Sequence, residues 1–433
     1  MELATMFIDM NAYFASVEQQ MRPELRDVPV GVVPVMTAGT CCIATSYEAR
    51  RRGVKTGTPV YDARRLCPEL RLVEARPPLY VQMHHKFVEA IESCLHVNEI
   101  KSVDEVSCQL MAGEKTPAQA TAKAREVKAA LRQACGRYMT CSIGIAPNRF
   151  LAKVASNMQK PDGLVLIEAH ELPRRLYGLE LPDLPGIGAG MYRRLCGEGI
   201  NTVRQLCALS INELRQIWNS VIGQRWWYWL RGHELAEMPI TRQSIGHSHV
   251  LPPRYRHDRG AYAVLVRLLH KAAARMRAKG YWARRLRVGI SFTPRGHWSA
   301  YRNLELCQDT ITLTEAFLKI WQTRTAGKPL RVGLVLEGLV PQSYATQPLF
   351  EPERRRVRLS LIIDDLNNRF GEDAVYLGSM HNARRTAPMR ISFTNIPDLP
   401  ENDVSKADRR LRHWRQPAGL PKRAGAQSPG PRD

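Results

Sequence analysis

Two neighbouring carboxylates, Asp104 and Glu105, stand between two runs of β-prone residues, 96–100 and 106–111. This pattern predicts a β-hairpin with an acidic turn. Adjacent carboxylates repel one another, so such a turn is costly unless the charge is exposed to water or neutralised by a cation. The hairpin is therefore either a plain surface feature or part of a cation-binding site.

The N-terminal segment supplies a third carboxylate. Residues 4–8 form a short apolar run with strand character, Asp9 stands at its end, and residues 12–20 have helical spacing. If the strands are neighbours in one sheet, Asp9, Asp104 and Glu105 converge on one edge. Three carboxylates suit Mg²⁺, which keeps waters and substrate phosphates as its other ligands. Each piece alone is more simply explained as an exposed hairpin and an N-capping Asp.

The charge of the chain indicates a polyanionic partner. The 433 residues carry a net charge of +22, and residues 240–392 hold 26 Lys and Arg against 11 Asp and Glu. Concentrated basic charge of this kind is typical of proteins that bind nucleic acid. A membrane surface is the rival partner, but the sequence shows no long uncharged apolar run to support it.

The cysteines and the N-terminus favour a cytoplasmic location. The ten cysteines contain no Cys-x-x-Cys pair and no zinc-ligand spacing, which predicts reduced thiols. We also expect no signal peptide, since the first residues lack a basic segment and a cleavage site.

Hydrophobic periodicity predicts a mixed α/β sheet with helices on one face. The expected strands are 28–33, 41–45, 140–146 and 164–167, and the expected helices are 78–94, 117–135 and 149–159. Tyr47 and Arg50 lie three residues apart on a helical turn, where a phenol and a guanidinium could hold phosphate. Lys160, at the exit of the last helix, could point back to the acidic edge, or it is a solvated lysine favoured by the helix dipole.

Four segments resemble, in order, the motifs of the Y-family, lesion-bypass DNA polymerases. They are residues 9–18, 46–50, 102–105 and 150–163. Each motif alone is weak, but four in family order are specific. The resemblance covers residues 1–392 and implies a multidomain α+β right hand.

Two later regions agree with this resemblance. Residues 183–190 and 199–202 resemble a helix-hairpin-helix, in which Gly186, Gly188 and Gly190 allow backbone N–H groups to approach DNA phosphates. The aromatic run 226–229 is expected to pack this small helical domain. Residues 285–292 alternate basic and apolar side chains, so one strand face is expected to pack and the other to meet phosphate.

The resemblance implies the following domains. They are a mixed α/β palm (1–10 and 75–168), inserted fingers (11–74), an all-helical thumb with the helix-hairpin-helix (169–236), a linker (237–245), an α/β little finger that binds DNA (246–392) and a basic tail (393–433) expected to be disordered.

The resemblance also implies the chemistry. Asp9 and Asp104 would hold two Mg²⁺ ions about 3.5–4 Å apart, with Glu105 completing the site nearest the attacking hydroxyl and the carbonyl oxygen of Met10 as an extra ligand. The further nucleotide contacts would be Tyr47, Arg50 and Lys160 on the β- and γ-phosphates, and Phe14 under the sugar, where it excludes a 2′-hydroxyl. Primer–template DNA and dNTPs are the implied partners.

A short segment after residues 331–339 is similar to peptides that bind the bacterial sliding clamp. Its residues are Gln347, Leu349 and Phe350, although Pro348 departs from the usual pattern. An exposed Leu-Phe pair favours a partner. The alternative is that both side chains fold into the core of the little finger.

Two other functions remain as alternatives. A non-catalytic DNA-binding accessory member would have lost the carboxylates, which are all present here, and a palm-type nucleotide cyclase would lack the thumb and basic domain. Asn11 occupies a position where the DNA polymerase IV branch typically has Asp, which is similar to the polymerase V catalytic subunit. The sub-branch and the need for accessory subunits stay open at this point.

Overall fold

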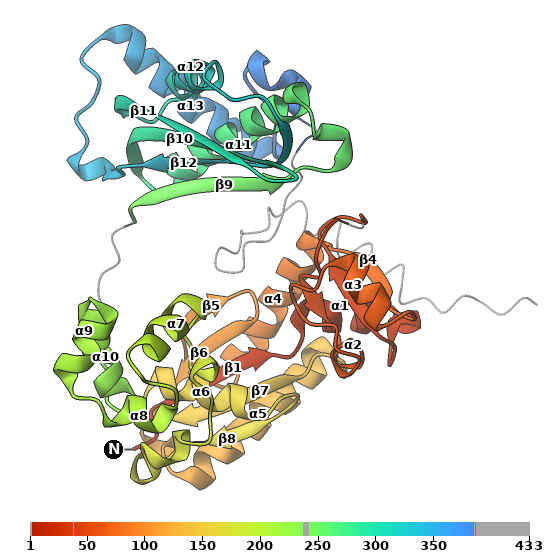
Figure 1. The fold of residues 1–433 in the computed structure, drawn as a ribbon, viewed down its shortest axis with the longest axis vertical. Coiled ribbons are helices and arrows are strands. Elements are labelled where there is room, and N and C mark those ends of the chain that lie inside the picture. Colours follow the sequence, from red (N-terminus) through yellow and green to blue (C-terminus); the bar gives the residue numbers. More distant parts are fainter. Residues whose placement is uncertain (1, 38, 237–241, 385, 387–433) are drawn as a thin grey trace, which may run out of the picture.

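The computed structural model describes residues 2–37, 39–236, 242–384 and 386, and its main strands form three sheets (Figure 1). The expected tail, 393–433, and most of the expected linker, 237–245, lie outside the described residues. Among the described residues, no helix has the length and apolar character needed to span a bilayer.

The first sheet has the strand order β5-β6-β1-β7-β8. Its strands are β1 (Thr5–Met10), β5 (Val97–Ser102), β6 (Glu105–Gln109), β7 (Cys141–Ala146) and β8 (Leu164–Leu166). All neighbours are antiparallel except β7 and β8. The predicted acidic hairpin is thus formed by β5 and β6, and its second strand pairs directly with β1.

Helices cover both faces of this sheet. Alternate residues of a strand face opposite sides, and Ile8 packs with α4 (Pro77–Glu92) and α5 (Pro117–Cys135), whereas Phe7 packs with α6 (Arg149–Met158). The expectation that helices cover only one face is therefore wrong. Helix α6 folds back across β1 and β7, and it has one apolar side to bury there.

The next unit is a small sheet with the order β3-β2-β4. It contains β2 (Val30–Val33), β3 (Ala44–Thr45) and β4 (Arg71–Glu74), together with α1 (Tyr13–Met21), α2 (Tyr47–Arg51) and α3 (Val60–Leu66). The strand expected at 41–45 is shorter than predicted. The backbone of Cys42 bonds instead to Thr58 O and Gly57 N–H, so this end of the segment pairs with a loop.

Four short helices follow: α7 (Ala189–Gly197), α8 (Val203–Ala208), α9 (Ile211–Trp218) and α10 (Val221–Trp229). Trp226 is buried among them, and its ring lies edge-on to Phe150 of α6 at 5.0 Å between centroids. The prediction that the aromatic run packs this helical unit is confirmed, and the contact also ties the unit to the first sheet.

The last unit is a second large sheet with the order β11-β10-β12-β9. Its elements are β9 (Ser244–Val250), α11 (Asp258–Ala278), β10 (Tyr281–Thr293), β11 (His297–Cys307), α12 (Thr310–Trp321), β12 (Lys328–Glu337), the short β13 (Val340–Pro341) and α13 (Glu351–Phe370). Leu286, Val288 and Ile290 face a core shared with α11 and α12. The alternate residues of β10 face away from this core, as the basic–apolar pattern predicts.

Candidate active site

The three predicted carboxylates, Asp9, Asp104 and Glu105, lie where β1 ends and β6 begins, at one end of the strands of the first sheet. We call this end of the sheet the carboxylate edge. Asp9, the penultimate residue of β1, lies directly opposite Glu105, the first residue of β6, in the antiparallel register. Asp104 lies in the turn before Glu105, and its carbonyl oxygen accepts a hydrogen bond from the Met10 N–H at 2.9 Å. One long-range strand pairing, of β1 with β6, therefore brings together carboxylates that are distant in sequence.

Asp104 is held in a half-buried position. Its Oδ1 accepts a hydrogen bond from the Ser102 hydroxyl at 2.6 Å. Burial raises the pKa of Asp104 to about 6, against the lowering effect of Ser102, and the negative charges of Asp9 and Glu105 contribute in the same direction as burial. A carboxyl group in this situation gains from a nearby cation.

Two lysines provide positive charge at this edge. The Lys153 ammonium donates to Asp9 Oδ2 and, at 2.6 Å, to Glu105 Oε1. Burial alone would lower the pKa of Lys153, but Asp9 and Glu105 outweigh it and raise the pKa, so the ammonium stays charged. Lys160 Nζ lies 2.8 Å from Asp9 Oδ1, so of the two alternatives for this side chain the structure has the one in which it points back to the acidic edge.

Sequence reasoning assigned no role to Lys153. The residue is part of the 150–153 motif, and it follows Arg149 by one helical turn on α6. Its position became evident only because α6 packs on β1, which places the Lys153 Nζ 4.9 Å from the Phe7 ring centroid. The presence of a lysine in this motif was the sequence signal that could have indicated its role at the site.

The donor set fits a hard divalent cation, although the carboxylates are not already arranged around one metal position. Among the described residues, no group of three His, Cys, Asp or Glu side chains is already arranged around a metal position. Ser102 and the two lysines occupy the carboxylate oxygens instead. Mg²⁺ needs only one or two carboxylates when substrate phosphates and waters complete its shell, so the residues fit this ion.

Tyr47, the first residue of α2, and Arg50, in its last turn, lie close together. The Arg50 guanidinium carbon is 4.8 Å from the centroid of the Tyr47 ring. The Tyr47 hydroxyl is buried close to Asn11 and Arg50, but no described group forms a well-aligned hydrogen bond with it, and burial raises its pKa against the lowering effect of Arg50. A buried hydroxyl without a partner is costly, which indicates a polar ligand at this point.

Phe14 lies in the first turn of α1, one turn beyond Asp9. Ala12 adopts a left-handed conformation (φ 47°) at the start of this helix, so the helix begins one residue later than predicted. The buried Asn11 amide oxygen accepts a hydrogen bond from the Asp162 N–H at 2.8 Å. Asn11 thereby ties the end of β1 to the loop that carries Lys160.

The predicted glycine turn lies before α7. Gly186 has φ 105°, a conformation that favours glycine, while Gly188 caps α7 and Gly190 lies in its first turn. A Cβ added at Gly188 or Gly190 would meet no described atom within 4 Å. The backbone of this turn is thus accessible to a large ligand.

The clamp-like segment lies on the surface. Leu349 is 77% exposed and Phe350 is 66% exposed, and Gln347 is exposed as well. The alternative in which both apolar side chains join the core of this unit is therefore wrong. They lie outside because α13 begins at Glu351 and buries mainly Val357 and Ser360.

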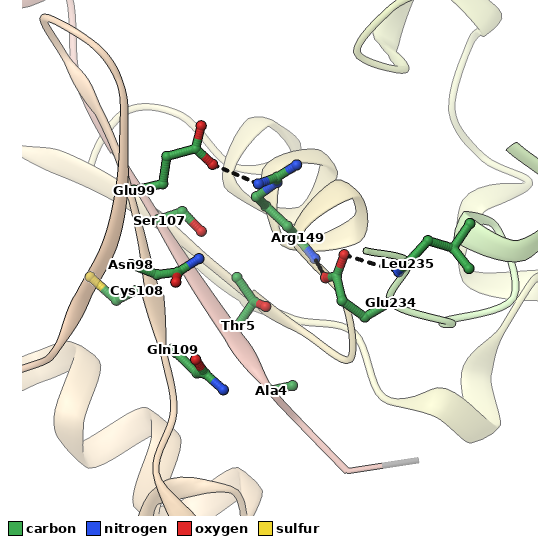
Figure 2. A pocket seen from close by; sticks show the side chains of 10 residues that line it. All are labelled: Ala4, Thr5, Asn98, Glu99, Ser107, Cys108, Gln109, Arg149, Glu234 and Leu235. Atoms are coloured by element: carbon green, nitrogen blue, oxygen red, sulfur yellow. Dashed lines mark hydrogen bonds and ion pairs between the residues drawn. The ribbon is translucent and has the colours of Figure 1, made fainter. Parts of the chain in front are cut away.

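A cavity of about 410 Å³ lies along β1, β5 and β6 (Figure 2), and none of the predicted site residues lines it. Its charged groups are already paired, because Arg149 Nη1 lies 2.6 Å from Glu99 Oε2 and the Arg149 N–H donates to Glu234 Oε2 at 2.8 Å. These contacts join α6 to the end of the helical unit, and we assign the cavity a structural role.

Comparisons with known proteins show the family of the chain. Residues 8–157 match the model of the impB/mucB/samB family, and residues 242–349 match that of its C-terminal domain. The DNA polymerase IV of Moorella thermoacetica is 30% identical over 87% of this chain and 95% of its own length. DNA polymerase IV 1 of Halalkalibacterium halodurans is 27% identical over 86% and 92%.

Solved structures show the same fold. A chimera of the Y-family DNA polymerases Dbh and Dpo4 superposes with a TM-score of 0.67 at 22% identity, covering 78% of this chain and 99% of its own. The family model and the DNA polymerase IV relatives show that the chain is a DNA-directed DNA polymerase. The chain belongs to the impB/mucB/samB family of Y-family polymerases, of the DNA polymerase IV type, and acts in translesion DNA synthesis. The choice between the DNA polymerase IV and polymerase V sub-branches, which the sequence had left open at Asn11, thus falls to the DNA polymerase IV type. The comparisons give no support to the non-catalytic accessory member.

Proposed function

We propose that Asp9, Asp104 and Glu105 are the catalytic carboxylates of this polymerase. The pairing of Asp9 with Glu105 across two strands, beside Asp104, is the observation that carries the proposal. Two Mg²⁺ ions, as divalent metal cofactors of the family, would activate the primer 3′-hydroxyl and neutralise the triphosphate. The chain's contribution is to fix these carboxylates, with the Met10 carbonyl oxygen as an additional ligand.

The incoming dNTP would be held by Tyr47, Arg50 and Lys160. The unpartnered Tyr47 hydroxyl and the adjacent guanidinium offer a donor and a positive charge for the β- and γ-phosphates. Lys160 reaches the same edge through its contact with Asp9. Phe14, which follows the carboxylate by one turn, would lie under the sugar and exclude a 2′-hydroxyl.

Primer–template DNA would be gripped by the second large sheet and by the glycine turn with Gly186, Gly188 and Gly190. On the open face of the sheet, the register places four small residues in one row across the strands: Ser248, Gly333, Gly289 and Ser299. Arg331 and His297 belong to the neighbouring row on one side, and Arg287 and Tyr301 to the row on the other. A low row with Arg331 on one side and Arg287, which also pairs with Glu337 at 2.7 Å, on the other allows a phosphate backbone to approach closely.

Recruitment would use the exposed segment with Gln347, Leu349 and Phe350, which we propose binds the sliding clamp. We also propose a cytoplasmic site of action on DNA and retain the domain limits given by the sequence.

The test is primer extension by Asp104→Ala and Glu105→Ala. We expect both variants to lose extension while primer–template binding stays within about threefold, because the carboxylates act on the reaction rather than on DNA affinity. Glu99→Ala is the matched control, since it removes a carboxylate from the same hairpin that pairs with Arg149 instead. Full extension by either site variant would refute the assignment.

A further inference from the structure

The ring of Phe14 packs against a second buried aromatic side chain. The Tyr80 ring of α4 lies stacked on Phe14, with 4.5 Å between centroids and 17° between planes. Phe14 is 2% exposed and Tyr80 is fully buried. The two residues are distant in sequence, and they meet because α4 packs against α1.

Tyr80 is itself fixed at its far end by a buried carboxylate. Its hydroxyl donates to Glu18 Oε1 at 2.8 Å, and Arg76 donates to both Glu18 oxygens, at 3.0 Å from Nε and 2.6 Å from Nη2. Glu18 is fully buried. A buried charge with this many partners holds a defined geometry, because loss of any partner leaves it poorly solvated.

Phe14, Glu18 and Tyr80 meet along one side of α1. Glu18 follows Phe14 by one turn on α1, so both lie on the same side of the helix. Tyr80 lies along that side, with its ring on Phe14 and its hydroxyl on Glu18. The main-chain oxygen of Tyr80 also accepts a hydrogen bond from the Tyr13 hydroxyl at 2.6 Å. Tyr80 is therefore held to α1 both at its hydroxyl and at its main chain.

We propose that Tyr80, fixed by Glu18 and Arg76, is a positioning residue for sugar selection. Phe14 can exclude a 2′-hydroxyl only if its ring keeps its position. Without the stacked ring of Tyr80, the Phe14 ring could move away from the sugar. This inference rests on the proposed role of Phe14 and extends it to residues that do not touch the nucleotide.

The experiment compares the efficiency of incorporation, kcat/KM, for a ribonucleotide and for the matching dNTP. We expect Tyr80→Leu to raise the ribonucleotide-to-dNTP ratio about tenfold, and Phe14→Ala to raise it further. Because Tyr80 acts through Phe14, adding Tyr80→Leu to Phe14→Ala should change the ratio no further.

Phe87→Leu is the matched control. Phe87 is also a fully buried aromatic residue of α4, but its ring contacts Tyr13 and His84 rather than Phe14. It should lower thermal stability like Tyr80→Leu and leave the ratio unchanged. If Tyr80→Leu does not fold, Glu18→Gln keeps the side-chain shape, weakens the hold on the tyrosine hydroxyl, and should raise the ratio about threefold.

Two negative results have different meanings. If Phe14→Ala raises the ratio and Tyr80→Leu does not, the positioning role is refuted and the sugar wall stands. If Phe14→Ala itself leaves the ratio unchanged, the proposed role of Phe14 fails and the inference fails with it. An equal rise for Phe87→Leu would also refute the inference, because general loosening of the core would then explain the effect.

Discussion

We expect Lys153→Met to destabilise the metal-depleted protein and to increase its stabilisation by Mg²⁺. The Lys153 ammonium lies between Asp9 and Glu105, and its side chain is 18% exposed. Methionine has similar length and packs against apolar neighbours, but it leaves the two carboxylates facing each other without this cation. Mg²⁺ would then have less positive charge to compete with.

The size of the effect follows from the burial of the group. Removal of one partner from a buried ion pair costs about 3–5 kcal/mol. Glu105 is partly exposed and Lys160 still contacts Asp9, so we expect about 2–3 kcal/mol. For a folding unit of 150–250 residues this corresponds to a fall in Tm of about 4–12 °C.

The assay is thermal unfolding with EDTA and with a series of Mg²⁺ concentrations. Binding at 100 times the Kd stabilises a protein by about 2.7 kcal/mol, so saturating Mg²⁺ should restore most of the lost stability. Lys123→Met is the matched control, because the partly buried Lys123 pairs with Glu126 of the same helix α5, at 2.8 Å, rather than with the carboxylates of the site. A Mg²⁺-dependent gain in Lys153→Met no larger than that of the parent protein would refute the reasoning.

Three further predictions concern other parts of the chain. Leu349→Ala with Phe350→Ala should leave Tm and distributive synthesis intact and remove stimulation by the sliding clamp, because such anchors carry most of a small interface's energy; a large fall in Tm or retained stimulation would contradict this. Arg331→Ala should reduce the slope of log K for DNA against log salt by about 0.9, and an unchanged slope would show that this side chain meets no phosphate. Burial, reinforced by two arginines, lowers the pKa of His270 to about 4, so the unfolded state takes up its proton near pH 6.5 before the native state does. His270 alone should therefore lower stability as the pH drops below 6.5, by about 2 kcal/mol at pH 5. His270→Gln should remove this share of the pH dependence of Tm, and the share of His84 and His247, whose pKa values burial also lowers to about 4, should remain; an equal pH dependence would refute the assignment.

The sequence by itself determined the local elements and the chemistry they carry. The acidic hairpin follows from β-prone runs on either side of Asp104 and Glu105, and the helix expected at 117–135 has those limits in the structure. Such features depend on residues that are close in the chain, where periodicity of 2 or 3.6 is recorded directly. The order of four motifs then identified the family, which the comparisons confirm.

Tertiary structure decided which side chains meet. Lys153 was assigned no role because its two carboxylates belong to strands far away in sequence, and only the packing of α6 on β1 brings them within hydrogen-bonding distance. The second covered face of the sheet has the same origin. The contact of Tyr80 with Phe14 depends on how two helices cross, and the exposure of Leu349 depends on which face α13 buries. A sequence pattern records the faces of single elements, whereas register and packing between elements are set by the whole chain, because the same apolar face can be buried against several different partners.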